Sequence, residues 1–467
     1  MSAPSNGKLN ILFFTHYFPP ESNAPASRVH ETCRHWVRQG HDVTVVTCAP
    51  NVPDGKIYPG YRNRLTQQEV IDGIHVNRVW TYIAANRGKR RRSLNYLSYL
   101  VSAIIRALYL KRPDVIIATS PQFFCGWTGA LARYVFRVPF ILEIRDIWPD
   151  SIVAVGAMRG SRKIRLMQWL ERKSYASATH IVTVGEGYRQ RLLSRNVPFS
   201  KISIITNGVD RGLFKQVNGN RELKTKLGLR GKFVCSYVGT IGMACGLDVV
   251  LRAAKSLKDQ REHDVVFLLV GAGAVREELE AKAKHEQLDN VIFAGQQEKS
   301  SVPAFLSVAD CCLVHLTRNE IFKSVLPSKI FEALAMKRPV ILGVEGYAAQ
   351  VVEEIGGGIC IEPENEQQLL SAIKALKSDP QHRAMLGARG HAEVVRNYDR
   401  ERLASDYLHV IEQVIKFKKP EKRPQVLPQS VMGATPARKP SRHRSWAARN
   451  SKTPWSSVTR RSSARRP

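Results

Sequence analysis

Residues 233–250 read FVCSYVGTIGMACGLDVV and predict a buried β-strand, a glycine-rich turn and the start of a helix. The apolar run 233–238 ends at Gly239, and a second apolar segment begins after Gly246. Because glycine has no Cβ, such a turn allows backbone N–H groups to approach a phosphate closely. The same strand-to-glycine pattern recurs at Gly271. Tight turns between a strand and a helix need glycine in any case, so neither turn identifies a nucleotide site by itself.

Short apolar runs alternate with amphipathic segments along most of the chain, a pattern typical of parallel sheets covered by helices. A first series of predicted strands comprises residues 9–15, 42–47, 114–119, 140–145, 180–184 and 201–206. A second series comprises residues 233–239, 265–271, 291–294, 311–316, 340–344 and 359–361. We therefore expect an α/β fold with two Rossmann-like domains and a ligand cleft between them, at the carboxyl ends of the strands.

The domain boundaries follow from breaks in this pattern. We place the first domain at residues 1–206 and the second at residues 207–398, because the polar stretch 207–220, which begins NGVD, interrupts the alternation. A helix at about residues 399–417 is expected to pack back on the first domain. Residues 418–467 are rich in Pro, Ser and Arg without an apolar period, so we expect a basic disordered tail.

Length and composition exclude several classes of protein. The chain has 467 residues, of which 43% are hydrophobic, enough for two domains with their own cores. It contains no uncharged apolar run of about 18 residues and no segment shaped like a secretory signal at its start, so we expect a cytoplasmic protein without a membrane span. The eight cysteines show no C-x-x-C spacing, which argues against a zinc site and against a disulfide framework.

The net charge of +31 is unevenly distributed. From Lys416 onward there are fifteen Lys and Arg against one acidic residue, so this segment carries +14. A basic tail is either a solvated appendage or a segment attracted to anionic lipid or nucleic acid. Specific nucleic-acid binding is not expected, because it requires basic and aromatic residues on a folded face, whereas nearly half of the excess charge lies in the tail.

Residues 87–112 read RGKRRRSLNYLSYLVSAIIRALYLKR, a basic cluster followed by an apolar run of helical length and further basic residues. One interpretation is an amphipathic helix that lies in an anionic lipid headgroup region. The other is a helix half-buried against the first sheet, with a basic loop ahead of it. The apolar residues that recur at helical spacing are Leu94, Tyr96, Leu97, Leu100, Val101, Ile104, Ile105 and Leu108.

Residues 324–339, SVLPSKIFEALAMKRP, predict a helix that begins just after a strand. Pro327 suits a first turn and Ser328 suits a capping position. Lys329 and Glu332 lie three residues apart and therefore share one side of the helix. A lysine at a helix N-terminus favours a diphosphate, and a carboxylate favours sugar hydroxyls. The alternative is a capped surface helix with an ordinary ion pair.

Polar residues also follow two strands of the first domain. His16 lies in THYFPP, residues 15–20, and Arg145 and Asp146 lie in EIRDIWPD, residues 143–150. The Asp146 carboxylate is suited to accept hydrogen bonds from sugar hydroxyls, with Arg145 balancing its charge, or else to cap the next helix. The chain contains no Asp-x-Asp, the commonest sign of a metal-bridged diphosphate. The charge of a leaving diphosphate would then be stabilised by lysine, arginine and a helix dipole.

Six segments together resemble the family-4 retaining glycosyltransferases of the GT-B fold: FFTHYFPPE, GHDVTVVT, RDIWPDS, TNGVD, YVGTIGMACGLDVVL and PSKIFEALAMKRPVI. They are most similar to the bacterial branch that builds O-antigen, capsule and exopolysaccharide, including N-acetylfucosaminyl transferases, and the resemblance covers roughly residues 9–417 in consistent order. The resemblance implies metal-independent transfer from a nucleotide diphosphate sugar to a lipid-linked saccharide, by front-face attack, at the cytoplasmic face of the inner membrane. A nucleotide-sugar epimerase or hydrolase of the same fold is the alternative.

The resemblance also implies roles for individual residues. Glu332 would hold the donor ribose, and Ser328 and Lys329 belong to the P-S-K-x-x-E element beside the diphosphate. Asp146 would touch the transferred sugar or the acceptor, together with His16 and Arg145. The glycine-rich residues expected around the phosphates are Gly239, Thr240, Gly242 and Gly271. We take Asp146, Lys329 and Glu332 as the catalytic candidates.

Two positions depart from the family pattern. Ser324 stands where the usual Glu-x7-Glu pair has its first glutamate, and Cys245 stands where a lysine commonly precedes the glycine of the second-domain loop. The charge that neutralises the phosphates must therefore come from another residue. Lys323 and Lys329 are the candidates.

Overall fold

The computed structural model describes residues 7–21, 23–52, 55–84, 89–120, 122–147, 150, 161–215 and 220–416. The predicted tail, residues 418–467, and residues 148–149 of the EIRDIWPD motif lie outside these ranges. Within the described ranges, no helix is long and apolar enough to cross a membrane.

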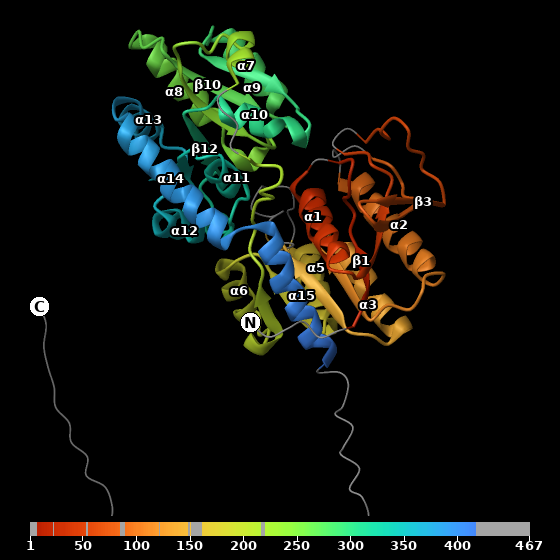
Figure 1. Cartoon of the computed structure of the whole chain (residues 1–467). Helices are drawn as coiled ribbons and strands as arrows, with labels where there is room; N and C mark the ends of the chain where they lie inside the picture. The colour runs from red at the N-terminus through yellow and green to blue at the C-terminus, as the bar shows by residue number, and fades with distance from the viewer. Residues whose placement is uncertain are drawn as a thin grey trace, which may run out of the picture. The chain divides into compact units, whose positions relative to one another are not determined.

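The first domain contains an eight-stranded sheet in the order β3-β4-β2-β1-β5-β6-β7-β8, in which only β3 is antiparallel to its neighbour (Figure 1). Its strands are β1 (Asn10–Phe14), β2 (Asp42–Cys48), β3 (Thr66–Ile71), β4 (Ile74–Val79), β5 (Val115–Thr119), β6 (Phe140–Ile144), β7 (His180–Thr183) and β8 (Ile202–Ile204). Its helices are α1 (Ala24–Arg38), α2 (Lys89–Ala107), α3 (Phe123–Phe136), α5 (Ser161–Ser177), α6 (Glu186–Leu193) and the 3₁₀ turn η1 (Phe199–Lys201).

The second domain contains a six-stranded parallel sheet in the order β11-β10-β9-β12-β13-β14. Its strands are β9 (Phe233–Val238), β10 (Val265–Val270), β11 (Val291–Gly295), β12 (Cys311–His315), β13 (Val340–Gly343) and β14 (Gly358–Cys360). Its α-helices are α7 (Arg221–Lys226), α8 (Asp248–Asp259), α9 (Arg276–His285), α10 (Val302–Ser307), α11 (Lys329–Ala335), α12 (Tyr347–Ile355), α13 (Glu366–Ser378) and α14 (Pro380–Asn397). Three 3₁₀ turns are η2 (Met243–Cys245), η3 (Lys299–Ser301) and η4 (Phe322–Ser324).

Each sheet is buried on both faces, which explains why its strands read as continuous apolar runs. In β10, VVFLLV, all six residues are buried, and their side chains alternate between two cores on opposite sides of the sheet. In the first domain, the cores on the two sides are closed by α2 and α3 and by α1 and α15 (Arg400–Lys416). The two Rossmann-like domains with parallel sheets confirm the predicted fold class.

The last helix, α15, packs on α1 of the first domain. The rings of Trp36 and Tyr407 lie 5.3 Å apart, and the Trp36 indole N–H donates to the Ala404 carbonyl at 2.9 Å. Leu403 and Ile411 share a core cluster with Phe13 of β1. The polypeptide thus returns from the second domain to complete the core of the first.

All twelve predicted strands are present, with ends shifted by a few residues, but the β3–β4 hairpin was not predicted. The β3 sequence TQQEVI is largely polar and alternates between exposed and half-buried residues, so it lacks an apolar run. A signal for the hairpin was nevertheless present. Asp72 and Gly73 form its turn with φ of 48° and 80°, the Asp-Gly pair that two-residue hairpin loops favour.

Trp36 is the side chain whose removal tests how α15 is attached. We expect Trp36→Ala to lower the free energy of unfolding by about 3–5 kcal/mol, because it leaves a cavity between α1 and α15. Leu65→Ala, at a residue that is 80% exposed, should change it by less than about 0.5 kcal/mol. Urea unfolding followed by circular dichroism measures both, and a Trp36→Ala loss as small as that of Leu65→Ala would contradict this packing.

Candidate functional site

Two glycine turns meet at the carboxyl ends of β9 and β10. Gly239 and Gly271 have φ of 137° and 142°, a conformation that side chains other than glycine rarely adopt. A Cβ on Gly271 would lie 1.9 Å from the Gly239 carbonyl oxygen, so the two turns pack backbone against backbone. A Cβ on Gly239 would lie 2.5 Å from Cε of Lys329. The predicted turns and Lys329 are therefore brought together at one edge of the sheet.

The rest of the first turn is held by its own side chains. The carbonyl oxygen of Thr240 accepts hydrogen bonds from the Tyr237 hydroxyl at 2.6 Å and from the Cys245 thiol at 3.2 Å. A Cβ on Gly242 would meet only the Thr240 methyl group, at 3.7 Å, so the space beside Gly242 is open. Cys245, at the position of the family's lysine, thus stabilises the turn and brings no cation to it.

Lys329 supplies a partly buried cation at this turn. Its ammonium donates to the Tyr237 hydroxyl and lies 3.7 Å from the centre of the Tyr237 ring. Burial lowers the pKa of Lys329, while the nearby Cys245 and Glu332 oppose that shift. Among the described residues, no carboxylate forms an ion pair with Lys329. A partly buried ammonium whose hydrogen bond goes to a neutral phenol is well suited to receive an anion.

The local structure of α11 differs from the prediction in two respects. Ser328 has helical φ and ψ of −63° and −23° and makes no capping bond with its side chain, because a capping residue needs an extended backbone. The helix also does not follow a strand directly, since η4 lies between β12 and α11. Lys329 and Glu332 do lie three residues apart in α11, on one side of the helix, and their charges interact.

Glu332 forms an ion pair with a lysine that was not among the predicted site residues. Its Oε1 lies 2.5 Å from Nζ of Lys299, which comes from η3 after β11 and lies 4.9 Å from the centre of the Phe214 ring. Although burial opposes the shift, Glu332 and Glu31 raise the pKa of Lys299. Lys299 occurs in the polar stretch EKSS with no distinguishing spacing, so no sequence signal marked it.

Arg145 is a second partly buried cation, and its hydrogen bonding is incomplete. In the part of the chain that the structure describes, its Nε and Nη1 are buried without a hydrogen-bond partner. The neighbouring Arg28 instead pairs with Glu143 at 2.7 Å. Burial and the charge of Arg28 lower the pKa of Arg145 to about 9. Buried polar groups are normally satisfied, so these two Arg145 nitrogens are suited to donate to an anionic or hydroxyl-bearing ligand.

Asp146 is positioned through the backbone. The Ser120 hydroxyl accepts from the backbone N–H groups of Arg145 and Asp146 at 2.7 and 3.2 Å. Burial raises the pKa of Tyr188 and the charge of Asp146 adds to that shift, so Asp146 lies near Tyr188 of α6. Residues 148–149 and 151–160 lie outside the described ranges, so the alternative role of Asp146 as a helix cap stays a prediction.

His16 lies in an aromatic cluster built mostly by α2. Its ring centre is 5.0 Å from that of Tyr17, 5.5 Å from Tyr96 and 5.2 Å from Tyr99. Burial lowers the pKa of His16 to about 4, although a hydrogen bond with Asn95 opposes the shift. His16 is therefore a neutral side chain near pH 7. Its partners from α2 were absent from the predicted site, because the sequence did not show which face of that helix is buried.

Lys323 and Ser324 lie apart from the glycine turns. The Lys323 ammonium pairs with Glu320 at 2.6 Å and with Glu345 at 3.7 Å, and its side chain is 42% exposed. Ser324 is buried, and a Cβ on Gly187 of α6 would lie 2.6 Å from the Ser324 Cα. The close packing leaves little room for a glutamate at position 324. Of the two lysines considered, Lys329 is the one at the turn.

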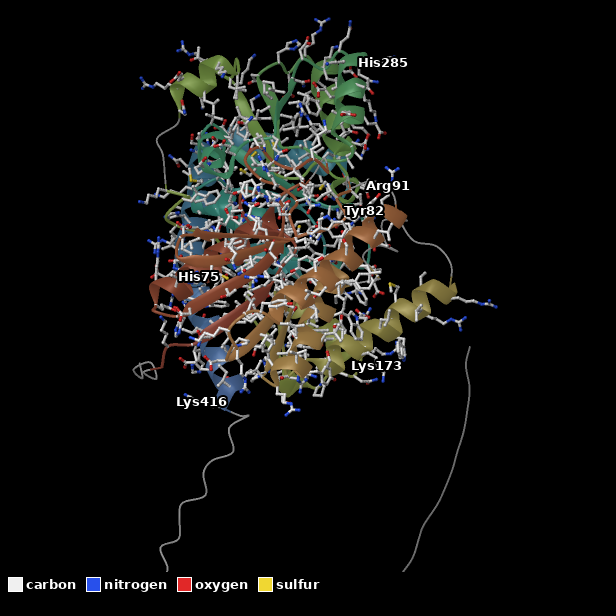
Figure 2. The ribbon with its side chains drawn as sticks, turned by 90° about the vertical axis from the view of Figure 1, so that its right-hand side faces the viewer. His75, Tyr82, Arg91, Lys173, His285 and Lys416 are labelled. Carbon is white, nitrogen blue, oxygen red and sulfur yellow. The ribbon has the colours of Figure 1, made fainter. Side chains whose placement is uncertain are left out.

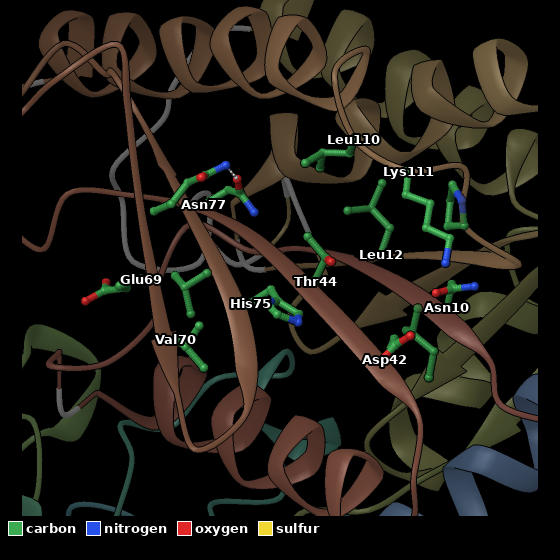
Figure 3. Close-up of a pocket in the computed structure, with 14 residues that line it drawn as sticks. Asn10, Leu12, Asp42, Thr44, Glu69, Val70, His75, Asn77, Leu110 and Lys111 are labelled. Atoms are coloured by element: carbon green, nitrogen blue, oxygen red, sulfur yellow. Dashed lines mark hydrogen bonds between the residues drawn. The ribbon is translucent and has the colours of Figure 1, made fainter.

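A cavity of about 510 Å³ lies elsewhere in the first domain (Figure 3). It is lined by Asn10 and Asp42, the first residues of β1 and β2, and by His75 of β4 and Lys111. In Figure 3 these residues surround the beginning of the strands, whereas His16 and Arg145 follow strand ends. This cavity is therefore separate from the candidate site.

Comparisons with known proteins match both domains to glycosyltransferase models. Residues 23–208 match the glycosyl transferase 4-like domain, and residues 220–393 match the glycosyl transferases group 1 family. The chain is 26% identical over 414 residues to the putative colanic acid biosynthesis glycosyl transferase WcaI of Escherichia coli K12, covering 86% of this chain and 100% of that protein. It is 23% identical to the probable glycosyltransferase WbjE of Pseudomonas aeruginosa, over 56% of this chain and 66% of that protein.

Among solved structures, Anabaena Alr3699/HepE in complex with UDP-glucose is similar in fold. The TM-score is 0.64 at 16% identity, with 87% of this chain and 100% of that chain covered. At this identity the likeness supports the fold alone, and it agrees with the two-domain GT-B architecture.

The depressed pKa of His16 predicts a pH-dependent stability. The unfolded side chain takes up a proton near pH 6.5 and the folded one only near 4, so stability is lost as the pH falls through this window. Between pH 7 and 5 the wild type should lose about 2 kcal/mol more than His16→Gln. Urea unfolding at both pH values tests this, with the exposed His285→Gln as control. Parallel pH dependence of wild type and His16→Gln would refute the assignment.

Proposed function

Because the family models identify the chain as a glycosyltransferase, we propose that it moves a sugar from a nucleotide diphosphate sugar to a lipid-linked saccharide acceptor in bacterial surface polysaccharide synthesis. The observation that carries the proposal is the Lys329 side chain packed against the Gly239 turn without a carboxylate partner among the described residues, with Glu332 on the same helix. The name of WcaI, colanic acid biosynthesis, supports the pathway class, and the UDP-glucose bound to HepE supports the donor class.

In this proposal the second domain holds the donor. The diphosphate lies against the backbone of the Gly239 and Gly271 turns. Its charge is neutralised by the Lys329 ammonium, because Cys245 stands at the position where the family commonly has a lysine. The ribose hydroxyls bind the carboxylate of Glu332, whose charge and orientation Lys299 maintains. This arrangement uses backbone N–H groups and an ammonium where the departing diphosphate develops negative charge.

The first domain would orient the transferred sugar and the acceptor. Asp146 accepts hydrogen bonds from sugar hydroxyls, and the unsatisfied Arg145 binds an oxygen of the donor or acceptor. The neutral His16 contributes hydrogen bonding and ring contact without charge. The bond between the sugar C1 and the diphosphate oxygen breaks as the acceptor oxygen bonds to C1 on the same face. Because the acceptor oxygen bonds to the face that the diphosphate leaves, the configuration at C1 is retained. The acceptor proton passes to the departing phosphate, so the protein contributes mainly by positioning the two reactants.

Metal independence is part of the proposal. The chain lacks Asp-x-Asp, and among the described residues no group of three His, Cys, Asp or Glu is arranged to hold a metal ion. Lys329 then provides the cation that a metal supplies elsewhere.

Substitution of the two donor-binding residues tests the assignment. Glu332→Gln and Lys329→Met should each weaken nucleotide binding by about 1.5–3 kcal/mol, the range for hydrogen bonds to charged groups. Lys323→Met removes a lysine of the neighbouring exposed ion pairs and should leave affinity unchanged. Titration calorimetry with a panel of nucleoside diphosphates measures these effects. A loss seen with Lys323→Met but absent with Lys329→Met would move the phosphate site to η4.

Sugar transfer in the presence of excess EDTA tests the electrostatic account. Most of the rate should persist, because Lys329 and the glycine turns stabilise the diphosphate. Loss of transfer that magnesium or manganese restores would contradict the proposal. Consumption of the nucleotide sugar without acceptor would favour a hydrolase or epimerase instead.

A further inference from the structure

Helix α2 has two apolar faces, of which the structure buries only one. Its inner face is buried and belongs to the first-domain core, with Tyr99, Ala103 and Ala107 at 0–2% exposure. Its outer face carries Leu94, Leu97, Val101, Ile105 and Leu108, each 47–55% exposed. Their spacing places them in one stripe along the helix. Single exposed apolar residues are ordinary, but a continuous stripe marks an interaction surface.

The neighbouring helices extend this stripe. Helix α2 packs against α3, and α3 packs against α5. Exposed apolar residues on α3 are Leu131, Tyr134 and Val135, at 40–68%, and on α5 they are Leu166 and Trp169, at 56% and 48%. Figure 2 shows α2 and α5 on the same side of the first domain, with Arg91 and Lys173 projecting from them. We call the outer surface of α2, α3 and α5 the three-helix face.

The charge of the three-helix face has a single sign. The three helices contain eleven Lys and Arg residues and one acidic residue, Glu171, which is 3% exposed. Arg91 on α2 and Arg165 and Arg172 on α5 are exposed, and the Lys173 ammonium lies 5.8 Å from the Trp169 ring centre. Helices of the second domain differ, because α9 mixes its basic residues with exposed acidic ones.

We propose that the three-helix face docks on the surface of an anionic lipid bilayer. Aliphatic residues and a tryptophan enter the boundary of the acyl region, while the surrounding arginines and lysines bind lipid phosphates. Charge complementarity selects this occupant, because a surface with a basic rim and no exposed acid on its helices matches an anionic plane. Since none of the described helices is suited to span a membrane, attachment through this face is interfacial.

Docking in this way would bring the bilayer to the acceptor side of the site. Tyr96 of α2 lies 5.5 Å from the His16 ring, and its hydroxyl accepts from Arg92 at 2.9 Å. The helix that carries the exposed stripe thus also contacts a candidate substrate residue. A saccharide on a lipid carrier would reach His16 while its lipid stays in the bilayer. This last step depends on the proposed lipid-linked acceptor, whereas docking itself does not.

The substitutions must avoid the inner face of α2. Ile104 packs partly against the core, so changing it would confuse unfolding with loss of docking. The suitable pair on α2 is Leu97→Glu/Ile105→Glu, and the pair on α5 is Leu166→Glu/Trp169→Glu. The matched control is Leu65→Glu/Val70→Glu, which places two charges at residues that are 80% and 64% exposed outside the face.

Flotation of the full chain with liposomes, with and without anionic lipid and at low and high salt, measures docking. Each pair on the three-helix face should lower binding to anionic vesicles at least tenfold at high salt, and the control pair should not. Circular dichroism and nucleotide titration show whether each variant remains folded and binds donor. Transfer to a water-soluble acceptor analogue should be unchanged, so that failure of docking and failure of the proposed function are distinguishable.

Three results would overturn the proposal. In the first, folded variants of both pairs float like the wild type, while truncation after Lys416 abolishes binding, which makes the tail the anchor. In the second, binding is equal with neutral and anionic vesicles at low salt. In the third, the wild type does not float but sediments as an oligomer that the face variants dissociate, which makes the face an interface between copies.

Discussion

The structure depends most on a network of charges, with two ion pairs buried and one partly exposed, between α1, α15, β6, η3 and the first turn of α11. Three ion pairs form it: Arg28–Glu143 at 2.7 Å, Arg400–Glu31 at 2.9 Å and Lys299–Glu332 at 2.5 Å. Removing one partner of a buried pair, Arg28–Glu143 or Arg400–Glu31, costs about 3–5 kcal/mol, because an uncompensated charge stays buried. Arg145 adds a cation beside this network without a carboxylate of its own. The candidate site therefore has an excess of positive charge, as an anionic donor requires.

This network also links the site to the fold. Arg400 begins α15, and its charge interacts with Glu31 of α1 and with Glu332 of α11. The same helix closes the first-domain core through Trp36 and Tyr407. Residues far apart in sequence are thus held by both apolar packing and charge.

The sequence predicted what depends on local pattern and missed what depends on long-range packing. The strands are predictable because burial on both faces requires continuous apolar runs in the sequence. The turns are predictable because the φ values of Gly239 and Gly271 require glycine at these positions. Lys299 was missed since its partner Glu332 lies 33 residues away. Ser328 was assigned as a cap because residue type alone does not reveal its helical backbone. For α2 the half-buried interpretation is confirmed, since one apolar face belongs to the first-domain core, and the lipid interpretation of the exposed face stays a prediction.

The central claim is that Lys329 and Glu332 hold the diphosphate and the ribose of the donor. A crystal structure of the full chain with a nucleoside diphosphate tests it most directly. The account predicts phosphate oxygens within hydrogen-bonding distance of the Lys329 ammonium and the backbone of the Gly239 turn, with ribose hydroxyls on Glu332. A nucleotide bound beside Lys323, or in the cavity near Asp42 and His75, would contradict it.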